Sequence, residues 1–489
     1  MLATTNRTKR LPLAIIILSL ALTVFTKSSQ SQTPEPQRDQ LLNGLKIVLI
    51  SRPGDPNVLL KLRIHSGAAF DIAGKNGLMS LLGEMLFPDP VTFEYFTNEI
   101  NGRLAVETGY DSIDVTMQGR AGEYDRIVDT LRVALVNTPL TPENVTKIRD
   151  ARVKALAAMK PSAADLADQL IASRLYDTFP YANPVAGTAE SVGRIERADL
   201  MIARDRFLSP NNATLVIVGG VDHAKAMRAL RQLLGGWRKS DELVPGTFRS
   251  PTPADARVLV ANYAGSSVVE VRLATRGLAR GDRDYAAANL LASVIKQRWQ
   301  KLVPNVKISV KHDAHALPGM LMMSATADTV RVAGVLESAR AAMKSTLELP
   351  PFDEEIAAAK AEVSGATNNM SADEKLATTL LNNEAYSLPS LSDQMKAWNT
   401  LAPADVQRVA TRLFKDAAVA SVVVGNANDL KTGLASLNVE ILGEAKPNAV
   451  APQAGAPKED KTRHTHFVFP AQKNTHPVLK PDKTPPKPD

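Results

Sequence analysis

The sequence contains no cysteine among its 489 residues. Disulfide bonds, thiol catalysis and thiolate metal sites are therefore excluded, because each of them needs a cysteine sulfur. Only one long apolar run occurs, so a protein with several membrane spans is excluded as well. Hydrophobic residues make up 44% and charged residues 22% of the chain, which is typical of a folded globular protein.

The body of the chain also lacks net charge, although the formal net charge of the whole sequence is +7. Residues 1–31 carry four basic side chains and no acid, and residues 443–489 carry eight basic side chains and five acids. The residues between these ends are therefore neutral overall. A duplex-binding domain carries its positive charge on the folded part, so we do not expect a nucleic-acid partner.

The first 31 residues have the pattern of an export signal. A basic start precedes the apolar run Leu11–Phe25 and the polar stretch Thr26–Gln32. An apolar run of roughly 15 residues is typical of a secretory signal peptide, whereas a membrane span needs about 20. We expect cleavage after Ser31 and a periplasmic or extracellular protein. The alternative is an uncleaved anchor formed by residues 11–25, which would be the protein's only contact with a membrane.

The C-terminal segment 443–489 holds nine of the 31 prolines, with lysines between them. Such a segment cannot bury enough apolar surface to fold, so we expect a disordered tail. His464 and His466 lie in it beside two phenylalanines. A solvated tail with an apolar patch is favoured over a metal site there.

Between the two ends the chain repeats itself. Residues 62–64 match residues 271–273, and residues 81–82 match residues 290–291, both at an offset of 209. A second ordered set of matches, toward the end of each half, repeats at an offset of 206. Two ordered sets with nearly equal offsets indicate two homologous halves.

We predict an N-terminal domain over 32–242, a proline-rich linker over 243–255 and a C-terminal domain over 256–442. The predicted first and last strands of the two domains are Val58–His65, Ala213–Val218, Val268–Ala274 and Ala420–Val424. Strands followed by blocks of helices favour the α+β class, with an antiparallel sheet covered by helices on one face in each domain.

The first long helix of the N-terminal domain has one apolar face. Leu78, Leu81, Leu82 and Met85 are spaced at i, i+3, i+4 and i+7. This spacing predicts a buried helical face that packs on the sheet.

Several segments together resemble one known family. They are Leu42–Leu45, Val58–Gly67, Gly74–Phe87, Phe179–Tyr181, Pro184–Ser191, Phe207–Asn212 and Val216–Asp222. Over about 42–430 the chain resembles the pitrilysin/insulinase-type zinc peptidases, or inverzincins, with the bacterial and mitochondrial-processing-peptidase type closest in length. The resemblance implies two similar α+β halves that face each other across a chamber, in agreement with the internal repeat.

Catalysis in this family requires His-x-x-Glu-His on the first long helix. The two histidines bind one zinc ion from a single helical face, and the glutamate activates the zinc-bound water. The resemblance puts Ser80 at the first ligand position, Gly83 at the general base and Glu84 at the second ligand position. It puts the third ligand position near Ala155.

One carboxylate cannot hold zinc against water, so the resemblance implies a non-catalytic member with no metal site and no cofactor. We expect the helix to tolerate Gly83→Glu, because the change removes a glycine from its interior. His312 and His315 form the nearest other metal motif, and we interpret them as surface decoration. An active zinc peptidase with a site that the pattern does not reveal is the alternative.

The family binds peptide as an added strand at a sheet edge. The corresponding segment keeps Gly102, Thr108 and Asp111. Ala105 stands where the family has the asparagine that contacts substrate. In the C-terminal domain only Arg298 matches the residues that hold substrate near the metal. Packing at a helix end is the alternative role for Arg298.

Three functions are consistent with these observations. The first is the inactive partner subunit of an active zinc peptidase of the same family, in a heterodimer whose peptide-binding chamber it helps to shape. The second is a stand-alone peptide-binding or scaffold protein of the cell envelope. The third is the active metalloendopeptidase, the one case in which zinc would be expected. The expected partners are an active peptidase subunit and extended peptides.

Overall fold

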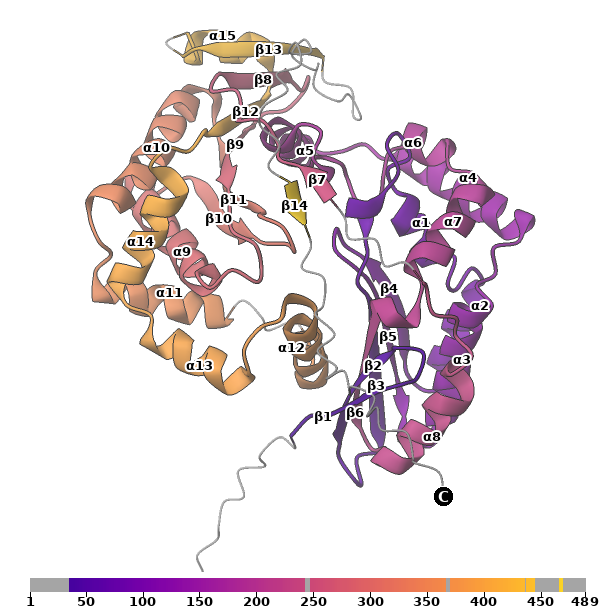
Figure 1. The fold of residues 1–489 in the computed structure, drawn as a ribbon. Coiled ribbons are helices and arrows are strands. Elements are labelled where there is room, and N and C mark those ends of the chain that lie inside the picture. Colours follow the sequence, from indigo (N-terminus) through magenta and orange to yellow (C-terminus); the bar gives the residue numbers. More distant parts are fainter. Residues whose placement is uncertain (1–34, 242–246, 366–369, 436, 445–465, 469–489) are drawn as a thin grey trace, which may run out of the picture. The chain divides into compact units, whose positions relative to one another are not determined.

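A computed structural model describes residues 35–241, 247–365, 370–435, 437–444 and 466–468 of the chain. Two six-stranded sheets and the helices around them make up most of these residues (Figure 1). The predicted signal segment and most of the predicted tail lie outside the described residues. None of the described helices is both long and apolar enough to cross a membrane.

Sheet 1 belongs to the first half and has the strand order β1-β2-β6-β3-β5-β4. Its strands are β1 (Gln37–Gln40), β2 (Lys46–Ser51), β3 (Asn57–Ile64), β4 (Arg103–Thr108), β5 (Ile113–Arg120) and β6 (Ala213–Gly219). Neighbouring strands are antiparallel except β2 and β6, which are parallel. This parallel pair corrects the expectation of a wholly antiparallel sheet, and it arises because β6 joins the sheet only after a long helical crossover.

Sheet 2 belongs to the second half and has the order β10-β11-β9-β12-β8-β13. Its strands are β8 (Val258–Asn262), β9 (Val269–Arg276), β10 (Lys307–Asp313), β11 (Met320–Ala327), β12 (Ala420–Gly425) and β13 (Val439–Glu444). The strands β8, β12, β9, β11 and β10 repeat the order and directions of β2, β6, β3, β5 and β4. The internal repeat and the α+β class are confirmed.

The helices of each half follow its strands in blocks. The first half has α1 (Leu78–Glu84), α2 (Pro90–Asn98), α3 (Tyr124–Val136), α4 (Pro142–Ala158), α5 (Ala163–Tyr176), α6 (Ala189–Gly193), α7 (Arg197–Phe207) and α8 (His223–Leu234). The second half has α9 (Tyr285–Leu302), α10 (Val332–Glu348), α11 (Asp353–Gly365), α12 (Ala372–Tyr386), α13 (Leu391–Thr400), α14 (Pro403–Phe414) and α15 (Ala427–Gly433).

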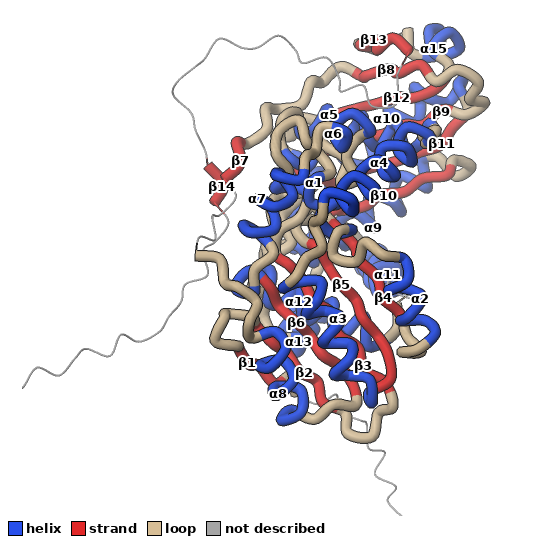
Figure 2. The backbone as a smooth tube through the Cα atoms, turned by 90° about the vertical axis from the view of Figure 1, so that its right-hand side faces the viewer, coloured by secondary structure: helices blue, strands red, loops and turns tan. Residues whose placement is uncertain are grey.

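Each sheet is covered on its second face by one helix from the other half. Helix α5 of the first half packs on β9 and β12 of sheet 2, and helix α12 of the second half packs on β3 and β6 of sheet 1 (Figures 1 and 2). The expectation of helices on one face only is therefore incomplete. The central strands β3 and β9 are buried along nearly their whole length because both of their faces are covered.

The predicted apolar face of the first helix is confirmed. Leu78, Leu81, Leu82 and Met85 are all buried, and they belong to the core between sheet 1 and its own helices. The predicted strands also agree with β3, β6, β9 and β12 to within two residues at either end.

Two short strands lie where no structure was expected. β7 (Thr247–Arg249) lies in the predicted linker, β14 (His466–Val468) lies in the predicted disordered tail, and the two pair antiparallel. Phe248 of β7 packs edge-on against Phe70 and Phe179. The expectation of a disordered tail therefore misses β14, whose backbone pairing with β7 adds to the packing of Phe248.

Candidate functional site

Helix α1 carries the positions at which the family resemblance places the metal motif. It begins after Gly77, whose φ of 96° lies in the left-handed region that favours glycine. The Asp71 carboxylate accepts the backbone N–H groups of Gly77 and Met79 at 2.7 and 2.8 Å. Burial raises the pKa of Asp71 to about 7. The first turn of α1 is thus fixed by a partly buried side chain that precedes it.

The general-base position lies close against the neighbouring strand β4. Gly83 is buried, and a Cβ atom added to it would lie 2.7 Å from the Thr108 hydroxyl oxygen and 3.5 Å from a Val106 methyl group. Both neighbours belong to β4. Against the expectation from helix propensity, we therefore predict that Gly83→Glu strains α1, because the Thr108 side chain would have to shift.

The second ligand position is occupied by an ion pair. Glu84 of α1 pairs with Arg152 of α4. Ala155, which the resemblance puts near the third ligand, lies one helical turn beyond Arg152 and is exposed. A guanidinium group thus neutralises the one carboxylate that could have bound a metal ion.

The side chains around α1 do not fit a zinc site. Ser80 offers only a hydroxyl group, Gly83 offers no ligand atom and Glu84 is paired with Arg152. Zinc sites in proteins use imidazole, thiolate and carboxylate ligands, with at least three from the protein. Across the described part of the chain, no cluster of three or more histidine, aspartate or glutamate residues could hold a metal ion.

The candidate peptide-binding segment lies on β4, at an edge of sheet 1. Gly102 precedes it, and a Cβ atom there would lie 1.8 Å from a carbonyl oxygen of β5, so only glycine fits. Thr108 faces α1, whereas Ala105 shares the opposite face with Arg103. Arg103 pairs with Glu374 of α12 at 3.0 Å. Among the described strands, β4 has β5 as its only neighbour, so its outer edge is unpaired.

Arg298 of α9 is held within the second half. Its guanidinium group pairs with Glu355 at 2.9 Å and donates to the carbonyl oxygens of Ser345, Leu349 and Pro350 at 2.9–3.2 Å. These carbonyls lie at and beyond the C-terminal end of α10. The geometry favours packing at a helix end over a contact with substrate.

His312 and His315 do not form a common site. The His312 Nε2 atom accepts the backbone N–H of Leu278 at 3.0 Å, and burial lowers its pKa to about 4. The His315 Nε2 atom lies 3.1 Å from a carboxylate oxygen of Asp313. The interpretation as surface decoration is wrong, because both imidazoles are largely enclosed and hydrogen-bonded.

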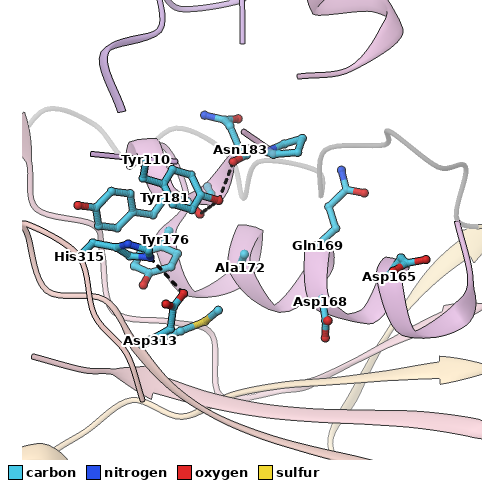
Figure 3. Close-up of a pocket in the computed structure, with 13 residues that line it drawn as sticks. Tyr110, Asp165, Asp168, Gln169, Ala172, Tyr176, Tyr181, Asn183, Asp313 and His315 are labelled. Atoms are coloured by element: carbon cyan, nitrogen blue, oxygen red, sulfur yellow. Dashed lines mark hydrogen bonds and ion pairs between the residues drawn. The ribbon is translucent and has the colours of Figure 1, made fainter. Parts of the chain in front are cut away.

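The sequence did not reveal a cavity of about 320 Å³ along α5 (Figure 3). Three tyrosines line it, namely Tyr110, Tyr176 and Tyr181, together with Asp313 and His315. Burial raises the pKa of Tyr110 to about 12. The tyrosine walls therefore stay neutral at physiological pH.

Asp111 joins residues of both halves beside this cavity. Its carboxylate accepts the Tyr181 hydroxyl at 2.9 Å and the backbone N–H of Ala316 at 2.7 Å. The Tyr386 hydroxyl of α12 lies 3.4 Å away. In the sequence, Asp111 and Tyr181 lie in two separate segments that carry the family resemblance, and that is the signal which could have suggested their contact.

Two family models match the chain in sequence order. The model described as insulinase (peptidase family M16) matches residues 46–189, and the model described as peptidase M16 inactive domain matches residues 194–363. The fold has the matching pair of α+β halves. The chain belongs to the insulinase-like M16 peptidase family, and it lacks that family's zinc-binding motif.

Curated relatives match over part of their length. Human mitochondrial cytochrome b-c1 complex subunit 1 is 22% identical over 246 residues, which are 49% of this chain and 51% of that protein. An uncharacterized zinc protease of Mycobacterium bovis is 23% identical over 206 residues, 41% of this chain and 47% of the protease. The chain thus spans about half the length of the curated relatives it matches.

A solved structure matches over a larger share of the chain. The crystal structure of a peptidase M16 inactive domain from Pseudomonas fluorescens has a TM-score of 0.72 at 17% sequence identity. The match covers 81% of this chain and 99% of that one. At this identity the likeness establishes the fold.

Proposed function

We propose that this chain is a non-catalytic subunit that pairs with an active zinc peptidase of the same family and helps to shape its peptide-binding chamber. The observation that carries the proposal is the Glu84–Arg152 ion pair at the second ligand position. An arginine beside that carboxylate repels a metal cation, and Gly83 has no side chain that could act as the base that activates water.

Two further observations support a role in binding rather than in chemistry. Among the described strands none pairs with the outer side of the edge strand β4, which suits the addition of an extended peptide as a further strand. One relative, cytochrome b-c1 complex subunit 1, is by its name a subunit of a larger complex. We therefore assign the chain a protein partner, extended peptides as ligands, and no bound zinc.

Native purification followed by mass spectrometry tests this function. The expected result is co-purification of one M16-family protein that carries His-x-x-Glu-His, in about equal amount, with peptidase activity in the pair and none in this chain alone. The matched variant is Arg152→Glu, which would give two carboxylates beside each other. We expect it to remain without stoichiometric zinc, because two carboxylates are fewer ligands than a zinc site needs.

Two outcomes would contradict the proposal. If no family member co-purifies but the isolated chain binds extended peptides, the second function holds, namely a stand-alone binding protein of the cell envelope. The free edge of β4 is the observation that favours this alternative. If the isolated chain holds about one zinc ion and cleaves peptides in a chelator-sensitive way, it is an active metalloendopeptidase.

We also propose that the subunit acts outside the cytoplasm. The support is the basic start and the apolar run Leu11–Phe25, which suit an export signal or a membrane anchor. N-terminal sequencing of the protein from its native host tests this, with a mature end near Gln32 as the expected result. A cytoplasmic protein that begins at Met1 would contradict it.

A further inference from the structure

The ion pairs that attach helix α12 to sheet 1 all have the same arrangement of charge. Every acid in these contacts lies on α12 and every base lies on the sheet or its connecting turns. The ion pairs are Arg38–Glu384 at 3.0 Å, Arg52–Asp373 at 2.6 Å and Arg103–Glu374 at 3.0 Å. They reach from β1 at one edge of sheet 1 to β4 at the other, so α12 is gripped across the whole sheet.

These ion pairs are partly exposed to solvent, and their acids Glu384, Asp373 and Glu374 are 23%, 31% and 13% exposed. The side chains of Arg38 and Arg103 are each 55% exposed. Exposed pairs contribute little individually, and salt screens them further. The three pairs therefore give the attachment of α12 a component that weakens as the ionic strength rises.

The apolar part of the α12 attachment is small. It consists of eight buried residues, namely Val48, Ile50, Leu59, Val216, Val218, Ala377, Leu380 and Leu381. The corresponding cluster around α5 has eighteen buried residues, of which thirteen lie on α5 or on sheet 2, and α5 itself contributes the aromatic ring of Tyr176. Since apolar burial is the main favourable term in such packing, α12 is held less firmly than α5.

A buried lysine opposes the docking of α12. Lys61 of β3 is 5% exposed, and among the described residues its ammonium group has one hydrogen bond, to the Thr378 hydroxyl of α12 at 2.9 Å, and no ion pair. The neighbouring carboxylate of Asp114 is taken by Arg63 at 2.6 Å. Burying a cation without an acidic partner is costly, so covering Lys61 reduces the gain from docking.

The equivalent positions in sheet 2 carry charges that balance each other. At the offset of 209, Lys61 corresponds to Glu270 and Arg63 corresponds to Arg272. Glu270 and Arg272 pair with each other at 2.9 Å, and Arg272 also pairs with Asp168 of α5. The helix over sheet 2 therefore covers a compensated set of charges, whereas α12 covers an uncompensated one.

We propose that α12 and its three ion pairs form a releasable clasp on sheet 1, while α5 is a permanent attachment to sheet 2. Release rehydrates Lys61 and frees Arg103 on the edge strand β4. The clasp thereby links the attachment of the second half to the strand that is the candidate peptide-binding edge. A free 15-residue helix is marginally stable in water, so released α12 also loses helical structure.

Hydrogen exchange of the full chain, read by mass spectrometry, tests the clasp. Peptides from residues 372–386 report on α12, and peptides from residues 163–176 report on α5 in the same sample. We expect α12 to exchange at least roughly tenfold faster than α5, and faster still when NaCl rises from about 50 to about 500 mM, because screening weakens exposed pairs. Exchange of α5 should not respond to salt.

Two variants with a matched control separate the clasp from general stability. Lys61→Met removes the buried charge and should slow hydrogen exchange of α12 by roughly tenfold. The reason is that the docked helix no longer covers an ammonium group without an acidic partner. The double variant Arg38→Gln with Arg103→Gln should speed α12 exchange and remove most of its salt response. Lys307→Met, at an exposed lysine of β10, should change neither helix.

Three results would overturn the proposal. One is α12 exchange as slow as that of α5 and independent of salt. The second is faster α12 exchange in Lys61→Met, which would mean that the lysine stabilises the docked helix. If that variant is poorly folded, Lys61→Gln replaces it, and the same slowing of α12 is required. The third is a salt response in the double arginine variant that equals that of the unaltered chain.

Discussion

The two halves share a framework and differ in how its charges are balanced. Arg63 and Arg272 occupy equivalent buried positions on β3 and β9, each under a helix from the other half. The residue two positions earlier is Lys61 in one half and Glu270 in the other. An internal repeat can thus keep its strands and a buried arginine in both halves. The residue two positions before the arginine then decides whether the charges beneath the covering helix are neutral overall or include one surplus cation.

Helix α1 and its counterpart α9 also differ in the placement of a charged group. At the offset of 209, Gly83 corresponds to Ala292 and Glu84 to Ser293. In the first half the carboxylate lies on α1 and its cation, Arg152, on α4. In the second half Ser293 bonds to Glu362 of α11, so the carboxylate lies on the packing helix instead. Both halves cross-link these two helices by a polar contact that needs no metal ion.

The largest expected difference between the halves concerns their buried arginines. Arg272→Met leaves Glu270 buried without a cation, so we expect a loss of about 3–5 kcal/mol in the free energy of unfolding. Arg63→Met should cost less, about 1–3 kcal/mol, because Lys61 lies on the same face and can pair with Asp114. Urea unfolding of both variants measures the difference.

The control for this pair is Arg272→Met combined with Glu270→Gln. We expect it to recover most of the lost stability, because no uncompensated charge stays buried. Equal losses in Arg63→Met and Arg272→Met would show that the charge balance of the two sheets does not matter.

The next effect concerns one buried histidine in each half. Burial lowers the pKa of both His65 and His312 to about 4, so both are neutral in the fold. The unfolded chain takes up these protons near pH 6.5, so stability is complete above that pH and is lost as the pH falls through 4. Each histidine contributes up to about 3 kcal/mol to this loss.

Unfolding free energies measured from pH 7 to pH 4 check this dependence. His65→Gln keeps a polar group beside Thr214, which lies 2.9 Å from the ring, and removes the titration. It should flatten the profile by about half. A profile that is flat in the unaltered chain would rule out neutral burial of both rings.

A smaller effect is expected at the glycine of α1 and its counterpart. Gly83→Ala should cost about 1–3 kcal/mol, because its Cβ atom would lie 2.7 Å from the Thr108 hydroxyl oxygen. At the equivalent Ala292 of α9, the reverse change to glycine should cost about 1 kcal/mol through helix propensity. Thermal unfolding of the two variants compares them, and a stabilised Gly83→Ala would restore the view that α1 tolerates side chains there.

The smallest effect is expected at the Glu84–Arg152 pair. Glu84 is 39% exposed, so Glu84→Gln should change the free energy of unfolding by at most about 1 kcal/mol. In the second half, Glu362→Gln should have a similarly small effect, since its side chain is 40% exposed. A loss of several kcal/mol in either variant would mean that the polar cross-link, rather than the apolar core, joins the two helices.

Much of the fold could be predicted because it depends on local pattern. The spacing of Leu78, Leu81, Leu82 and Met85 fixes which side of a helix is apolar, and that face is buried in the structure. The short matches at offsets of 209 and 206 revealed the two halves, since homologous strands need the same apolar positions. The loss of the metal motif was likewise visible, because Ser80 and Gly83 cannot act as a zinc ligand and a base.

The packing of α5 on sheet 2 and of α12 on sheet 1 could not be predicted. Apolar periodicity shows that a helix has a buried face but not which sheet covers it. The Asp111 contacts with Tyr181 and Ala316 were hidden for a related reason, because they join residues 70 and 205 positions apart. Such distances carry no local pattern.

The sequence by itself determined the two-half α+β framework, the neutral body and the absence of a zinc motif, because each depends on residue identity and spacing. Only the tertiary structure decided that Arg152 neutralises Glu84, that Gly83 lies against Thr108 of β4, and that Lys61 is buried beneath α12. Each of these depends on which surfaces meet. The physical reason is that pairing, steric fit and desolvation arise between segments distant in the chain, where propensity and periodicity have no reach.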